Sequence, residues 1–260
     1  MDRSPIDVEA LRQSLPPEWH RVDVVPETGS TNADLIARKG RGEDIAGTVL
    51  LAEHQTAGRG RHGRTWSAPP RSQIAMSAGV DATGVATETW GWLPLLTGLA
   101  VVETVRDLGV EAVLKWPNDV LVGSEKLAGI LAEVSGHVIV VGVGVNVSLT
   151  PEELPDPRAV SLSMLGIKPE RTTLAIALLT ALSRRLMRWR DAGGADAATI
   201  RDYRRVSATI GARVRAVLPG GSEIVGTALG IDDSGRLLID DGNATVTVSA
   251  GDLTHLRPAV

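Results

Sequence analysis

The segment Gly-Arg-Gly-Arg-His-Gly-Arg-Thr-Trp at residues 58–66 is the most distinctive part of this chain. Its three glycines let the backbone take positive φ values and come close to a bound molecule. Its three arginines carry planar sets of N–H donors that suit phosphate and carboxylate oxygens. Trp66 ends the segment with a flat apolar surface. This combination predicts a loop that binds an anion.

The loop lies between two segments that have the pattern of buried strands. Residues 47–53 are almost continuously apolar, and residues 72–80 resume as a second strand. A solvated surface loop and a disordered Arg-Gly segment that contacts RNA are the alternative interpretations. The loop is single, however, and its tryptophan is a residue type seldom left exposed. These features favour anion binding at the edge of a folded sheet.

The composition excludes several classes of protein. The chain has 260 residues and a formal net charge of −4, whereas general nucleic-acid binders are usually basic. It has no cysteine, which excludes disulfides, thiol catalysis and cysteine metal sites, and its five histidines lack metal-ligand spacing. The N-terminus lacks a signal-peptide pattern, and no apolar run approaches the roughly 20 residues of a membrane helix. We expect a cytoplasmic protein without a DNA or membrane partner.

The remaining sequence predicts an α+β fold, with a mixed sheet flanked by helices and a small β domain. Valine or isoleucine on both faces of residues 138–147 makes that strand central. Short β-type runs cut by tight turns begin at Gly211 and predict a small barrel. We expect domains at residues 1–208 and 209–260. The expected helices are 8–11, one starting after Ser30–Asn32, 93–108, 172–190 and 197–206, and the other expected strands are 113–116, 120–122 and 126–135.

Three further motifs carry polar or glycine residues on strands and turns. Lys115–Asp119 (KWPND) places a lysine at a strand end and two polar side chains in a turn, which turn chemistry and a snorkelling lysine would also explain. Lys126 begins a buried strand, where an edge charge with a structural role is the simpler interpretation. Residues 142–147 hold a Gly-x-Gly fragment without a third glycine or a following helix, so they are no dinucleotide fingerprint. Glycines inside a strand mark either packing or the close approach of another group.

Taken in this order, the motifs resemble those of the biotin protein ligases. The matching segments are Ser30–Asn32, Glu53–Arg64, Lys115–Asp119, Lys126–Glu133 and Gly142–Asn146. The resemblance covers most of the chain, and residues 150–210 contribute little to it. It implies a class II synthetase-like ligase domain followed by an SH3-like β-barrel. Some members carry an N-terminal winged-helix domain and repress transcription, whereas only about 20 residues precede the matching region here, so we expect a ligase without operator binding.

The resemblance implies a reaction in two steps. Biotin and ATP, with Mg²⁺, give biotinyl-5′-AMP and pyrophosphate, and a lysine of a biotin carboxyl carrier domain of an acyl-CoA carboxylase then takes the biotinyl group. Because the carboxylate and the α-phosphate are both anions, cations that stabilise the developing charge are the main requirement. A lipoate or octanoate ligase of the same fold is the nearest alternative, and a nucleic-acid-binding module is the alternative from another class.

Site residues follow from the resemblance, position by position. The implied biotin pocket has its ureido end lined by Ser30, Thr31, Asn32 and Gln55. The implied covering loop, over biotin and the adenylate phosphate, includes Gly58, Arg59, Arg61 and Arg64. Lys126 would contact the biotin carboxylate and the α-phosphate, and we expect Lys126, Arg59 and Arg61 to be catalytic. The implied adenylate and ATP contacts are Arg61, Arg64, Trp66, Lys115, Asn118, Lys126 and Asn146, with Asp119 near Mg²⁺ or the incoming lysine.

Overall fold

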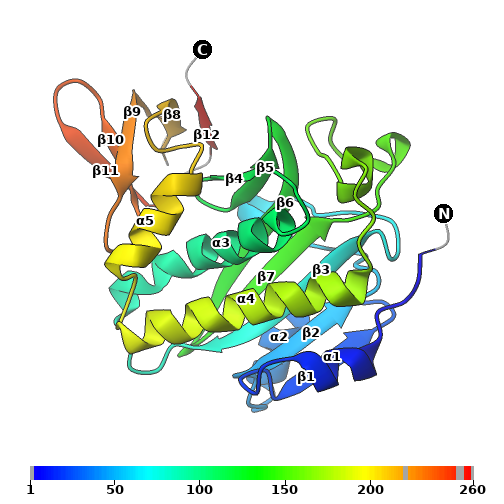
Figure 1. The fold of residues 1–260 in the computed structure, drawn as a ribbon. Helices are drawn as coiled ribbons and strands as arrows, with labels where there is room; N and C mark the ends of the chain where they lie inside the picture. Colours follow the sequence, from blue (N-terminus) through cyan, green and yellow to red (C-terminus); the bar gives the residue numbers. More distant parts are fainter. Residues whose placement is uncertain (1–2, 219–221, 250–254, 259–260) are drawn as a thin grey trace.

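The computed structural model describes residues 3–218, 222–249 and 255–258 (Figure 1). Its larger part is a seven-stranded mixed sheet in which β1 and β2 are parallel and the other neighbours are antiparallel. In spatial order the strands are β1 (Arg21–Val25), β2 (Thr48–Ala52), β3 (Gln73–Asp81), β7 (Val138–Asn146), β6 (Glu125–Ser135), β5 (Asp119–Val122) and β4 (Ala112–Lys115). The strand expected at 138–147 is therefore central, as predicted.

Helices cover the two faces of this sheet unequally. The helices α3 (Leu93–Arg106) and α4 (Arg171–Asp191) lie side by side on one face and bury the main core (Figure 1). The shorter α2 (Thr31–Gly40) covers part of the other face and buries a second, smaller cluster around Leu35 and Leu50. Ser30 caps α2, because its hydroxyl accepts from the Ala33 N–H, so the helix begins at Thr31, two residues before the start expected from the sequence. The helix α1 (Val8–Ser14) packs on β1 and α4.

A buried ion pair fixes the N-terminal segment to the sheet. The Glu53 carboxylate accepts from the Arg171 guanidinium at 2.5 Å and from the Ile6 N–H at 2.7 Å. Arg171 also donates to the carbonyls of Ser4 and Gln73, and both charged side chains are less than 10 % exposed. The charges are thus desolvated, but they are paired with each other and accept or donate further hydrogen bonds, the condition under which a buried pair is tolerated.

The C-terminal part is a five-stranded antiparallel sheet preceded by α5 (Ala197–Val206). Its strands, in spatial order, are β11 (Thr245–Val248), β10 (Leu237–Asp240), β9 (Glu223–Ile231), β8 (Arg213–Val217) and β12 (His255–Pro258). It lies at the end of the molecule nearest β4 and α5 (Figure 1). The short strands expected after Gly211 are confirmed, and the domain boundary at 208/209 stays a prediction.

Most of the expected elements are confirmed within a few residues. The strand β1 was not predicted, because its RVDVV sequence is short and has charges at its start and centre. Within the described ranges, no helix is both long and apolar enough to cross a membrane.

Candidate functional site

The floor of the site is formed by the part of β7 in which small and polar residues replace valines on one face of the strand. Because side chains alternate along a strand, Val138, Val140, Gly142, Gly144 and Asn146 share one face. The two valines are buried in the cluster beneath α2. The two glycines and the asparagine continue this face beyond them and line a cavity of 520 Å³. That volume is within the usual range for small-molecule sites.

The cavity brings together residues from segments far apart in the sequence. Predicted site residues that line it are Ser30, Thr31, Asn32, Gln55, Arg59, Arg61, Arg64, Trp66, Lys115, Asn118, Asp119, Lys126 and Asn146. Gly58 is the exception. A Cβ at this position would lie 2.3 Å from the Trp66 carbonyl oxygen and 2.9 Å from Gln55 Nε2. A glycine is therefore required at position 58 by packing at the base of the loop, and this residue does not line the cavity.

A buried polar network occupies the end of the cavity below α2. The N–H and hydroxyl of Thr31 both donate to Gln55 Oε1, at 2.9 and 3.1 Å. The Asn32 amide nitrogen donates to Glu133 at 2.8 Å, and Asn32 Oδ1 accepts from Ser77 at 2.5 Å. These bonds fix both amides, since a backbone N–H can only meet the oxygen end of Gln55 and a carboxylate only the nitrogen end of Asn32. Gln55 Nε2 is consequently the end available to a ligand.

Asn32 can reach this position only because β7 has a glycine opposite it. A Cβ at Gly142 would lie 2.3 Å from Asn32 Oδ1. Ser77 pairs in register with Gly142 on the neighbouring strand β3 and points to the same face. Ser77 and Glu133 are members of the network that sequence analysis missed, because only the sheet register brings them beside α2.

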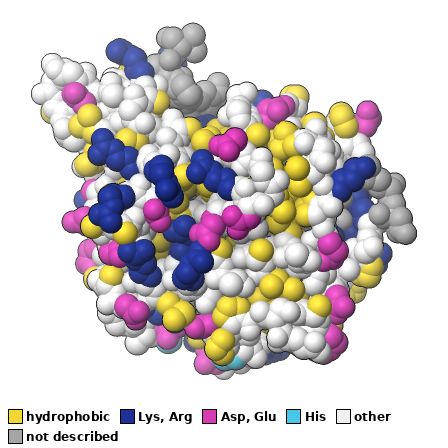
Figure 2. Space-filling view, viewed as in Figure 1, with side chains coloured by type: hydrophobic (Ala, Val, Ile, Leu, Met, Phe, Trp, Pro, Cys, Tyr) yellow, Lys and Arg dark blue, Asp and Glu magenta, His cyan; other side chains and the backbone are white. Residues whose placement is uncertain are grey.

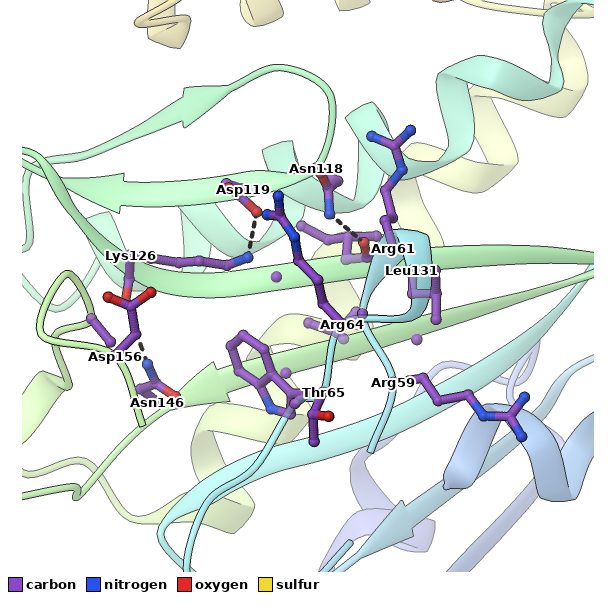
Figure 3. Close-up of a pocket in the computed structure, with 18 of the residues that line it drawn as sticks. Arg59, Arg61, Arg64, Thr65, Asn118, Asp119, Lys126, Leu131, Asn146 and Asp156 are labelled. Atoms are coloured by element: carbon purple, nitrogen blue, oxygen red, sulfur yellow. Dashed lines mark hydrogen bonds and ion pairs between the residues drawn. The ribbon is translucent and has the colours of Figure 1, made fainter. Parts of the chain in front are cut away.

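A second group of residues, at the other end of the cavity, is charged. Lys126 Nζ lies 2.5 Å from Asp119 Oδ1, and their strands β6 and β5 are hydrogen-bonded neighbours. The Arg64 side chain points toward this pair, whereas Arg59 and Arg61 point away from it (Figure 3). Burial lowers the pKa of the Arg61 guanidinium, Asp119 opposes that shift, and Arg64 adds to it. A guanidinium in such surroundings favours the approach of an anion.

Trp66 lies against the floor at the position of the two facing glycines. A Cβ at Gly144 would lie 2.4 Å from its indole, and one at Gly129 would lie 3.2 Å from it. The indole N–H donates to the Gln73 side chain at 2.5 Å, and Lys126 Nζ lies 5.5 Å from the ring centroid. The glycines of the Gly-x-Gly fragment of β7 are thus explained by packing of the chain's own side chains, Asn32 on Gly142 and Trp66 on Gly144, which is one of the two interpretations that the sequence left open.

The arginine-glycine loop is a small hairpin. Residues Arg59 and Thr65 form an isolated antiparallel bridge, Gly60 N donates to Arg64 O at 2.7 Å, and Trp66 N donates to Gly58 O at 2.8 Å. The hairpin turns at His62 and Gly63, both with positive φ (55° and 72°). Arg59 and Arg64 are exposed on it and Arg61 is half-buried.

Residues 155–159 complete the cavity wall and were not predicted. Pro155, Asp156, Arg158 and Ala159 line the cavity. Lys126 N donates to Arg158 O at 2.7 Å, and Asn146 donates to the Val160 carbonyl at 3.1 Å. The pKa of Asp156 is lowered to about 2 by hydrogen bonds from the Arg158 side chain and backbone. The segment has turn-type residues without a chemical motif, so no sequence signal distinguished it from an ordinary loop.

The metal predicted near Asp119 has no preformed site of its own. In the part of the chain that the structure describes, no three His, Cys, Asp or Glu side chains converge on one point. The Asp119 carboxylate is engaged by Lys126. Mg²⁺ commonly binds through one or two carboxylates together with substrate phosphates. These residues therefore fit an ion that arrives with a nucleotide.

Comparison with known proteins defines the class. The model of the "Biotin/lipoate A/B protein ligase family" matches residues 30–148, and that of the "Biotin protein ligase C terminal domain" matches residues 209–255. The biotin–[acetyl-CoA-carboxylase] ligase of Mycobacterium tuberculosis is 53 % identical over 98 % of this chain and 97 % of its own length. The bifunctional ligase/repressor BirA of Escherichia coli is 32 % identical over 92 % of this chain and 74 % of its own. This chain therefore belongs to the biotin protein ligase family.

Solved structures agree with this assignment. The biotin protein ligase of Aquifex aeolicus in complex with biotin and ATP is 27 % identical, with a TM-score of 0.78 over 92 % of this chain and 99 % of the other. The Leishmania major enzyme in complex with biotinyl-5-AMP is 27 % identical, with a TM-score of 0.59 over 90 % of this chain and 100 % of the other. The family and fold expected from the motifs are thus confirmed.

Proposed function

We propose that this chain activates biotin with ATP and transfers the biotinyl group to a lysine of a biotin carboxyl carrier domain of an acyl-CoA carboxylase. The observation that carries the proposal is a single cavity with the hydrogen-bonded polar side chains of Thr31, Asn32 and Gln55 at one end and Lys126, Arg64 and Asp119 at the other. The similar protein of Mycobacterium tuberculosis is named for acetyl-CoA carboxylase, which supports the class of acceptor.

The polar end fits a ureido ring. Such a ring has one carbonyl acceptor and two N–H donors. Gln55 Nε2 is oriented to donate to the ureido oxygen, because Thr31 occupies Gln55 Oε1. The second lone pair of Asn32 Oδ1 and the hydroxyl of Ser30 can accept from the ureido N–H groups. A lipoyl ring lacks the ureido carbonyl and N–H groups, and it would leave Gln55 Nε2 without an acceptor at an appreciable free-energy cost.

The charged end fits the first chemical step. A biotin carboxylate oxygen attacks the α-phosphorus of ATP, the bond from that phosphorus to the bridging oxygen breaks, and pyrophosphate leaves. Lys126 and Arg64 lie where they can neutralise the two anions that meet. Mg²⁺, when bound, neutralises the leaving pyrophosphate, and Asp119 is the side chain we assign to it, once Lys126 turns from the carboxylate to the phosphates.

The second step needs no nucleophile from this protein. The neutral amine of the carrier lysine attacks the acyl carbon, the bond from that carbon to the AMP oxygen breaks, and the amine loses a proton. Until then the anhydride must be shielded from water. We propose that the 58–66 hairpin closes on the adenylate and turns Arg59 and Arg61 inward, since both point away from Lys126 here (Figure 3). A cytoplasmic location, where ATP and the carrier domain would both be available, stays a prediction.

A nucleic-acid-binding role is less well supported. Lys and Arg side chains do gather over α4 and α5, but acidic side chains lie among them (Figure 2). Arg184 and Arg185 both pair with Glu103, and Arg188 pairs with Asp196 at 2.6 Å. Their charge is therefore largely compensated and is not a strip of free cations for a phosphate backbone.

The test is adenylate formation by the intact protein. Purified protein is incubated with α-labelled ATP, MgCl₂ and either biotin or lipoate, and then with a biotin-accepting domain. We expect biotin-dependent release of pyrophosphate, a labelled biotinyl adenylate, and transfer to the acceptor lysine. An acyl adenylate formed from lipoate but not from biotin would refute the proposed substrate. Salt-dependent RNA binding without nucleotide consumption would refute the ligase activity.

A further inference from the structure

The turn between β9 and β10 of the C-terminal sheet is in direct contact with the ligase domain. This turn, residues 232–236, meets the short helix η2 (Thr87–Trp92) so closely that the two backbones are in contact. A Cβ at Gly91 would lie 2.3 Å from the Ser234 carbonyl oxygen, and one at Gly235 would lie 2.6 Å from the Gly91 backbone. No side chain fits between them, so the two glycines set how closely the turn approaches.

Two tryptophans of the ligase domain hydrogen-bond to the carbonyls of this turn. Trp92 Nε1 donates to Asp232 O at 3.0 Å, and Trp116 Nε1 donates to Gly235 O at 3.1 Å. Both indoles are buried, with 0 % and 1 % exposed. A buried indole N–H without an acceptor is strongly disfavoured, so these two rings keep their orientation only while the turn is in place.

Trp116 connects the turn to the charged end of the cavity. It follows Lys115, lines the cavity, and belongs to the segment 115–119 that also contributes Asn118 and Asp119. Its backbone N–H is held by the Thr209 hydroxyl at 2.9 Å, immediately before the C-terminal sheet. The Asn118 side chain in turn donates to Ile130 O at 3.0 Å, which ties the segment to β6. The polar network at Thr31 and Gln55 makes no contact of this kind with the turn.

We propose that the 232–236 turn is a positioning element for the nucleotide half of the site, with Gly235 and Trp92 acting through Trp116 on residues 115–119. The inference rests on the proposed adenylation. It predicts that loosening the turn weakens the use of ATP while biotin binding persists, because the ureido ring of biotin binds at the Thr31–Gln55 end of the cavity, away from residues 115–119.

The experiment compares two glycines of the same small sheet. Gly235→Ala adds a methyl against Gly91, whereas Gly242→Ala adds one in open space, and both positions have positive φ (79° and 93°). The two variants therefore share the backbone strain and differ in the contact. We expect Gly235→Ala to raise the KM for ATP about tenfold, the effect of losing one good hydrogen bond, with the biotin Kd from calorimetry within about twofold. Gly242→Ala should leave both constants within about twofold of the wild type.

A second variant and a second measurement guard against simple unfolding. Trp92→Phe keeps a ring against Tyr203, which the indole meets edge-on at 5.9 Å, and removes the N–H donor together with the volume of one ring. Amide hydrogen exchange reports on residues 115–119 without any turnover. We expect faster exchange there in Gly235→Ala and Trp92→Phe than in Gly242→Ala, with unchanged exchange in α2. Wild-type exchange at 115–119 in both variants would overturn the inference, as would equal losses of ATP and biotin binding. Absence of adenylate from the wild-type protein would instead refute the proposed function.

Discussion

Replacing Lys126 by alanine separates a catalytic role from a structural one. The Lys126 and Asp119 side chains are 34 % and 24 % exposed, so solvent screens their ion pair. Such pairs contribute roughly 0–1 kcal/mol to stability, and the melting temperature should fall by no more than about 2–4 °C. Loss of a cation that stabilises charge developing at the α-phosphate costs about 2.7–4 kcal/mol of transition-state stabilisation, a rate loss of about 10²–10³-fold.

The assay is pyrophosphate release at saturating biotin and ATP, with thermal unfolding of the same samples. Lys168→Ala is the matched control, since Lys168 is exposed and lies outside the cavity. Lys126→Arg keeps the charge and should retain more activity than Lys126→Ala. A Lys126→Ala protein that keeps its rate but melts about 10 °C lower would refute this reasoning, because it would give the lysine a purely structural role.

Three further substitutions test other parts of the structure. Glu53→Gln leaves Arg171 buried with a neutral partner and should lower the free energy of unfolding in urea by about 3–5 kcal/mol; a change below about 1 kcal/mol would argue against the buried pair. Gly144→Ala would place a methyl 2.4 Å from the indole that covers this strand, so nucleotide binding should weaken while the fold is kept, and unchanged ATP affinity in calorimetry would contradict that. Arg158→Ala should return the Asp156 pKa from about 2 toward its ordinary value in an NMR titration. Because the folded-state pKa is lowered, this pair's contribution to stability is present above about pH 4 and is lost as the pH falls toward 2. An Asp156 pKa that Arg158→Ala does not move would remove Arg158 as the cause.

The helices and most strands of the fold could be predicted because their signals are local. Ser30 caps α2 through a hydrogen bond to a residue three positions away, and the valines of residues 138–147 require burial on both faces whatever lies above them. The site residues were predicted from resemblance to a family, and all but Gly58 line one cavity. Gly58 shows the limit of predicting site residues from family resemblance, since a glycine is required there by the Trp66 backbone beside it.

What the sequence determined by itself was the order of the elements, the place of the central strand and the loops that carry the charged and polar motifs. Only the tertiary structure decided which residues meet. Lys126 reaches Asp119 from the neighbouring strand through a side-chain ion pair, although the β5–β6 register sets Asp119 opposite Gly129. The β3–β7 register places Ser77 beneath α2, and the chain's return after β7 places Asp156 at the cavity wall. Hydrogen-bonded turns and helix caps depend on neighbours within a few positions. The side-chain contacts in the site depend instead on strand pairing and packing between segments up to about a hundred residues apart, and no local sequence pattern specifies them.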